Sequence, residues 1–111
     1  MNLEIYEPSS EGYEVKHRFD GWRIAYLCHA DRFDHITYLE RHMETDEIFV
    51  LLSGTATLLI GEQMKEVKMK PGAMYNVKKA LWHNIRVSRD AVVMIVENED
   101  TGKENSEYLY L

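Results

Sequence analysis

Short stretches in which apolar and polar residues alternate constrain the fold of this chain more than any other feature. Residues 22–28 alternate with a period of two, which places Trp22, Ile24, Tyr26 and Cys28 on one face. A period of two is the spacing of a β-strand. We expect this face to point toward the interior of the protein.

Alternation or a short apolar run between turn signals predicts further strands at residues 36–42, 47–52, 55–60, 64–69, 82–87 and 91–97. Turn signals such as Ser53-Gly54 and Pro71-Gly72 separate them, because Pro fixes φ and Gly tolerates a positive φ. Residues 105–111 fit either a short helix or a strand. Several short strands at this spacing are typical of an all-β sandwich or barrel.

The length of 111 residues supports a single domain. Within it we expect an N-terminal arm or edge strands over residues 1–20, a barrel over residues 21–97 and a C-terminal tail over residues 98–111.

The composition excludes several classes of partner. The chain has 19 acidic and 13 basic residues, a net charge of −6. Nucleic acids and anionic membrane surfaces require a basic footprint, so we expect neither as a partner. No apolar run approaches the roughly 20 residues that span a bilayer, and the first residues lack a signal-peptide pattern. A lone cysteine, Cys28, suits the reducing cytoplasm, where we expect it to be a buried, unreactive thiol.

The stretch 47–52 is apolar on both faces, with Phe49 and Leu51 on one side and Ile48, Val50 and Leu52 on the other. Such a strand needs cover on both sides. A second copy of the chain is the simplest outer cover, so we expect a homodimer with two-fold symmetry.

Polar residues of metal-binding type interrupt this apolar pattern at three places. Glu40 and His42 share one face of their strand, and Glu47 begins the next strand after a short connection. His83 heads an otherwise apolar face of a separate strand. A buried imidazole without a partner costs about 1–3 kcal/mol, so His83 calls for a partner in this cluster.

The spacing of these residues resembles the first motif of the cupin superfamily, a group of small jelly-roll barrels. That motif runs His-x-His, three or four residues, Glu, six residues, Gly. The residues Glu40, His42, Glu47 and Gly54 match this spacing, with Glu in place of the first His.

The second cupin motif runs Gly, five residues, Pro-x-Gly, two residues, His, three residues, Asn. Its positions are taken here by Gly72, Lys78, Ala80, His83 and Val87. The spacing holds, while the Pro, the second Gly and the Asn are replaced. The resemblance covers residues 36–97 and implies an all-β double-stranded β-helix, or jelly-roll, fold.

The resemblance also implies a metal site, with His42, Glu47 and His83 on three ligand positions and Glu40 where the first His would be. Such a mixed imidazole and carboxylate set suits Mn, Fe, Ni or Zn. A metal-free polar pocket is the main alternative. Glu40 has two further interpretations, as a general base with a pKa raised by burial or as a solvated surface residue.

Three functions follow from these features. The first is a metal-dependent enzyme acting on a carbohydrate or a small organic acid, the second is a metal-free sensor or carrier of a small ligand, and the third is a dimeric scaffold. Tyr26 and Tyr38, on the faces assigned to the interior, are either pocket walls that orient a ligand or ordinary core residues. The sequence leaves catalysis itself open, because the fold selects no reaction.

Overall fold

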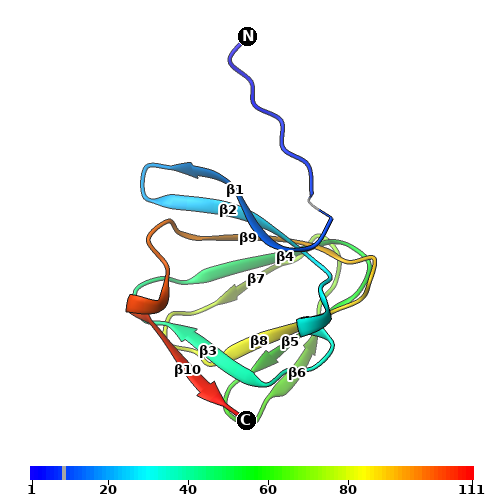
Figure 1. The fold of residues 1–111 in the computed structure, drawn as a ribbon, viewed down its shortest axis with the longest axis vertical. Coiled ribbons are helices and arrows are strands. Elements are labelled where there is room, and N and C mark those ends of the chain that lie inside the picture. Colours follow the sequence, from blue (N-terminus) through cyan, green and yellow to red (C-terminus); the bar gives the residue numbers. More distant parts are fainter. Residues whose placement is uncertain (9) are drawn as a thin grey trace.

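The structure is a computed structural model that describes residues 1–8 and 10–111. The described residues form two five-stranded antiparallel sheets that face each other (Figure 1). The first sheet has the order β1-β2-β9-β4-β7, and the second has the order β10-β3-β8-β5-β6. This arrangement confirms the predicted all-β jelly-roll architecture.

The strands of the first sheet are β1 (Gly12–Phe19), β2 (Trp22–Cys28), β4 (Glu47–Ser53), β7 (Met74–Val77) and β9 (Val92–Asn98). Those of the second sheet are β3 (Tyr38–His42), β5 (Ala56–Ile60), β6 (Lys65–Lys68), β8 (His83–Val87) and β10 (Ser106–Tyr110). Two short 3₁₀ turns, η1 (Asp31–Phe33) and η2 (Lys103–Asn105), lie between strands. No helix among these residues combines the length and apolar character needed to cross a membrane.

The core lies between the inner faces of the two sheets. Its most buried members come from central strands of both sheets: Ala25, Leu27, Phe49, Leu51, Leu58, Ile85, Val93 and Ile95. Burying apolar surface at about 25 cal/mol per Å² is the main force that holds the sheets together.

The prediction that Trp22, Ile24, Tyr26 and Cys28 form the inner face of β2 is wrong. Ala25 and Leu27 belong to the core, whereas Tyr26 is half-buried on the opposite face, beside Met94 of β9. Both faces of β2 are apolar, so alternation identified two faces without indicating which one points inward.

The strand β4 is covered unequally on its two sides. Phe49 and Leu51 are buried in the core, while Val50 is buried and Ile48 half-buried on the outer face. Leu52, at the end of that outer row, is 47% exposed. The outer face of this sheet is thus apolar and incompletely covered.

Gly54, which closes β4, has a φ of +72°, and a Cβ there would lie 2.6 Å from the Cα of Ala91. A glycine is therefore required at this motif position.

Three strands add to the seven that were predicted outright: β1 and β10 were each one of two alternatives, and β7 was not predicted. β1 is an edge strand, as one of the two alternatives for residues 1–20 allowed. β7 spans four residues and was hidden by the flanking turn residues. β10 pairs with β3, so residues 106–110 form a strand rather than a helix.

Candidate metal and ligand site

The two sheets bring four candidate ligand residues into one place. Glu40 and His42 alternate on β3, His83 begins β8, and Glu47 begins β4 in the facing sheet. Glu40 and His83 are direct cross-strand neighbours. Alternation therefore points Glu40 and His42 to the same side, where the first residues of the two other strands meet them.

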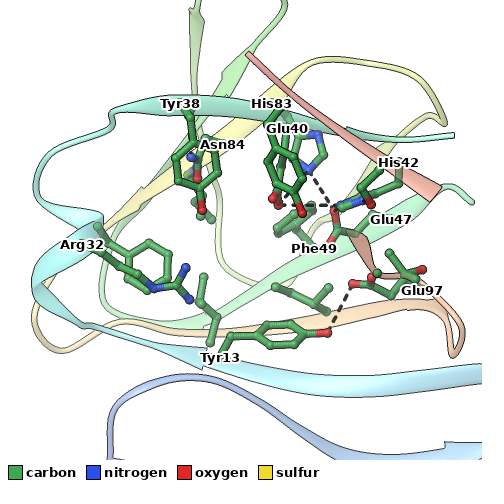
Figure 2. A pocket seen from close by; sticks show the side chains of 18 of the residues that line it. Tyr13, Arg32, Tyr38, Glu40, His42, Glu47, Phe49, His83, Asn84 and Glu97 are labelled. Atoms are coloured by element: carbon green, nitrogen blue, oxygen red, sulfur yellow. Dashed lines mark hydrogen bonds and ion pairs between the residues drawn. The ribbon is translucent and has the colours of Figure 1, made fainter. Parts of the chain in front are cut away.

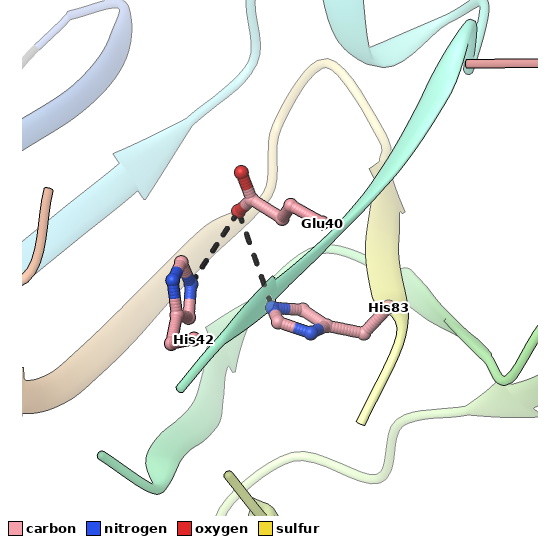
Figure 3. Close-up of side chains that lie close together, drawn as sticks. All are labelled: Glu40, His42 and His83. Atoms are coloured by element: carbon pink, nitrogen blue, oxygen red, sulfur yellow. Dashed lines mark ion pairs between the residues drawn. The ribbon is translucent and has the colours of Figure 1, made fainter. Parts of the chain in front are cut away.

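One oxygen of Glu47 lies at the centre of this group (Figure 2). Its Oε1 is 2.9 Å from Nε2 of His83 and 3.2 Å from Nε2 of His42. Glu40 approaches the same two imidazoles, with its Oε1 3.7 Å from Nε2 of His42 and 4.0 Å from Nε2 of His83 (Figure 3). The two ring nitrogens thus face both carboxylates.

The other nitrogen of each imidazole has its own partner. Nδ1 of His83 is 2.9 Å from the carbonyl oxygen of Leu81, and a carbonyl only accepts, so Nδ1 carries the hydrogen. Nδ1 of His42 lies 2.8 Å from the hydroxyl of Ser106, its cross-strand neighbour on β10. Such outer contacts fix ring orientation and leave Nε2 directed at the shared centre.

The protonation equilibria reflect this convergence. Burial disfavours the charged form of Glu47, but hydrogen bonds from His42 and His83 outweigh it and hold the pKa of that carboxyl well below its usual range. Burial also disfavours the charged imidazoles, yet the hydrogen bond to Glu47 and its charge raise the pKa of both His42 and His83. Burial raises the pKa of Glu40. The group therefore favours positive charge at its centre.

The donor set fits a divalent transition metal. Ligand atoms of Glu40, His42 and His83 all lie within 4.8 Å of one another, and Glu47 adds an oxygen next to both imidazoles. Metal–ligand bonds of about 2.0–2.2 Å place ligand atoms roughly 3–4.4 Å apart around one ion. Two nitrogen and two oxygen donors are a set that Mn, Fe, Ni and Zn accept.

Glu97, on β9, is a functional candidate that the sequence analysis missed. It is 6% exposed, and one of its carboxylate oxygens lies within 4.8 Å of ligand atoms of His42 and Glu47. It is also paired with Arg23 across 3.1 Å and accepts a hydrogen bond from the hydroxyl of Tyr13. Burial and the charge of Glu47 raise the pKa of Glu97 to about 8.

A signal for Glu97 was present in the sequence. Glu97 ends the apolar face of its strand after Val93 and Ile95, in the same way that His83 heads the apolar face of β8. A charged residue that lies at either end of a strand, on the face that points into the core, is therefore a candidate site residue. His42, Glu47 and Glu97 form a second cluster of metal-ligand type, entirely buried.

The cluster lies at one side of a cavity of about 230 Å³ between the sheets. Tyr38 lines this cavity together with Glu40, His42, Glu47 and His83. The other lining residues are Tyr13, Arg23, Leu27, Arg32, Phe33, Phe49, Asn84, Ile85, Ile95, Glu97, Thr101, Gly102, Ser106 and Tyr108.

Tyr26, the other predicted pocket tyrosine, lies on the face of β2 opposite to Arg23 and Leu27, which do line the cavity. The structure therefore brings Tyr38 into the candidate site and keeps Tyr26 out of it. Cys28 is buried, as predicted, and burial raises the pKa of its thiol.

Comparison with known proteins shows the fold. No protein-family profile matches the chain, and no curated protein sequence matches it. A Klebsiella pneumoniae protein with a double-stranded β-helix domain superposes with a TM-score of 0.66 at 13% identity, over 95% of this chain and 90% of that one. A cupin-2 domain protein from Shewanella frigidimarina superposes with a TM-score of 0.58 at 15% identity, over 84% of this chain and 82% of that one.

A third structure, Fe(II) HppE, superposes with a TM-score of 0.58 at 16% identity, over 78% of this chain and 48% of that one. The chain is therefore a small cupin-like protein in fold, as its two motifs predicted. At these identities the likeness extends to the fold alone.

Proposed function

We propose that this chain holds a divalent transition metal in its cavity and acts as an enzyme on a carbohydrate or a small organic acid. His42, Glu47 and His83 would bind the ion, with Glu40 as the fourth ligand. The observation that carries the proposal is that the Nε2 atoms of two buried imidazoles converge on the same carboxylate oxygen. When bound, a metal of this kind polarises a carbonyl or activates a bound water.

The remaining chemistry belongs to the residues of the chain. Glu40 is the ligand residue with the most solvent access, its side chain being 28% exposed, and burial raises its pKa. These properties suit it, where His42, Glu47 and His83 hold the ion without it, to accept a proton from a substrate at the open side of the cluster. Tyr38 lines the same cavity and would orient the ligand.

Metal analysis of the purified protein tests this proposal. Protein prepared without chelator should contain close to one equivalent of Mn, Fe, Ni or Zn, and His83→Asn should lose it. His35→Asn, which changes an exposed histidine that belongs neither to the cluster nor to the cavity lining, is the matched control and should keep the metal. A metal content near zero in the parent protein, or full content in His83→Asn, would overturn the ligand assignment.

The second candidate function is a metal-free binding module for a small polar ligand. It is favoured by one specific observation, that Glu47 and the two imidazoles already satisfy one another at 2.9 and 3.2 Å. The substitution of Glu40 for the first motif His points the same way. A ligand that raises the melting temperature of metal-free protein without being turned over would support this function.

We also propose that the protein is a homodimer in the cytoplasm, a location favoured by its single buried Cys28. On the outer face of the first sheet, Leu52 is 47% exposed and Met74 is 75% exposed. Residues 1–8 extend away from the sheets (Figure 1), and within them Leu3 is 60% and Ile5 is 75% exposed. Two copies related by a two-fold axis would cover each other's apolar face and arm.

Light scattering at micromolar concentration tests the dimer. The parent protein should have twice the chain mass, and the double substitution of Leu3 and Ile5 by Glu should halve it. Leu111→Glu, at another exposed apolar position, is the control and should leave the dimer intact. A monomeric parent protein would contradict the proposal.

A further inference from the structure

The cavity has opposite chemical character on its two sides. The cluster of Glu40, His42, Glu47 and His83, called here the Glu and His cluster, occupies one side. Arg32 projects into the cavity from the other side (Figure 2). The cavity also has apolar walls, which include Leu27, Phe49 and Ile85. A ligand that fills this space must therefore present different groups at its two ends.

Arg32 is held in position but left without a counter-ion. Its guanidinium carbon lies 4.3 Å from the ring centroid of Phe33, which is itself 5% exposed. This cation–π stacking orients the guanidinium without neutralising its charge. No ion pair to Arg32 exists among the residues that the structure describes, although its charge favours the ionised form of Glu40 across the cavity.

The other arginine of the cavity is already engaged. Arg23 pairs with Glu97 across 3.1 Å and donates to the carbonyl of Glu99. Arg32 is therefore the cation available to a ligand.

A count of charges defines what the cavity would accept. A divalent ion on the cluster balances the two carboxylates of Glu40 and Glu47, while Arg23 is already held by Glu97 and by the carbonyl of Glu99. Arg32 is then the cation of the cavity that has no ion-pair partner among the described residues. Because guanidinium binds carboxylates through parallel hydrogen bonds, a monocarboxylate would complete the balance.

We propose that the ligand of this cavity is a small hydroxy- or oxo-carboxylate, with its carboxylate on Arg32 and its other oxygen directed at the Glu and His cluster. This inference rests on the proposed metal site, because the bound cation removes the repulsion that Glu40 and Glu47 would exert on an anion. The volume of about 230 Å³ is below the usual 300–1,000 Å³ of drug-sized pockets, which restricts the ligand to a few carbon atoms. By linkage, metal and carboxylate each strengthen the binding of the other.

The test uses a ladder of probes: glycolate, 3-hydroxypropionate and 4-hydroxybutyrate, each beside its uncharged amide. Binding is followed by NMR titration of the full chain, with Zn(II) added and in the presence of chelator. At low ionic strength at least one acid should bind roughly tenfold more tightly than its amide to the Zn(II)-loaded protein. The acid of best length reports the span from Arg32 to the cluster.

Two variants that each remove one positive charge distinguish a specific contact with Arg32 from a general electrostatic attraction of the protein for anions. Arg32→Gln should abolish the preference for acid over amide, while Arg18→Gln, which removes an exposed arginine on β1, should retain it. Both positions are exposed, so both variants should fold with an unchanged melting temperature. Equal binding of acid and amide, a preference that survives in Arg32→Gln, or no binding by any of the acids would overturn the inference.

The outcomes distinguish this inference from the proposed function. If Zn(II) binds and Arg32 makes no difference, the metal site stands and the carboxylate ligand is wrong. If Zn(II) fails to bind but metal-free protein still prefers acids through Arg32, the metal site is wrong and the ligand class stands.

Discussion

Replacing Glu47 by Gln should destabilise the metal-free protein in a pH-dependent way. Glu47 is 5% exposed and accepts hydrogen bonds from His42 and His83 at 3.2 and 2.9 Å. Gln keeps the shape of the side chain and one acceptor oxygen but removes the negative charge. A hydrogen bond to a charged group contributes about 1.5–3 kcal/mol, so we expect a loss of about 2 kcal/mol when both imidazoles are protonated.

The sign of the pH dependence follows from the two histidines. Glu47 raises the pKa of His42 and His83 in the folded protein above the unfolded value of 6.5. The stabilisation by this ion-pair cluster is therefore complete below pH 6.5 and is lost as the pH rises through the folded-state pKa values. The carboxyl of Glu47 stays ionised through this window, because its pKa lies well below its usual range.

Urea unfolding in the presence of chelator, at pH 5.5 and at pH 9, measures this difference. The loss of about 2 kcal/mol at pH 5.5 corresponds to roughly 10 °C in melting temperature, and it should shrink below about 1 kcal/mol at pH 9. Glu62→Gln, at an exposed turn position, is the control for removing one negative charge and should change little at either pH. An equal loss at both pH values, or no loss at pH 5.5, would refute this account of the cluster.

Three further predictions concern residues in turns. Ala80 has a φ of +67° where the family motif has Gly, so Ala80→Gly should stabilise the protein by about 1 kcal/mol in urea unfolding; a destabilisation would contradict this. Gly54→Ala should lower the free energy of unfolding by about 3 kcal/mol in the same assay, because φ is +72° and the new Cβ would lie 2.6 Å from the Cα of Ala91. A loss below about 1 kcal/mol would show that the turn adapts. Hydrogen bonds from Asn76 and from the backbone of Lys79 lower the pKa of Asp46 below 3.8. The parent protein should therefore be more stable than Asp46→Asn above pH 3.8 and should lose this advantage as the pH falls through the lowered pKa. A difference in stability that persists in strong acid would contradict this.

The strands and the Glu and His cluster could be predicted because each is encoded in a short stretch of sequence. Alternation or a short apolar run predicted β2, β4, β8 and β9, because each strand carries its own local pattern. The spacing of Glu40, His42 and Glu47 predicted that these side chains would lie near one another, and the structure places them together with His83. Binding of a metal by this group stays a prediction.

The missed features depend on long-range packing. Tyr26 and Arg23 lie on opposite faces of one strand whose two faces are both partly apolar, so only the facing sheet decides which of them enters the cavity. Glu97 enters the site because β9 lies between β2 and β4, an order that no local pattern specifies. Arg32 reaches the cavity from a turn, where alternation carries no information.

The attachment of β3 has a consequence for the kinetics of the cavity. This strand carries Glu40 and His42, yet it pairs with β8 at Glu40 and His83, while it pairs along its whole length with β10. Separation of β10 would therefore detach β3 from its main support and remove the Ser106 hydroxyl from His42. Amide hydrogen exchange in β10 and dissociation of an ion from the cluster would then report one opening motion, and a bound ion would slow both.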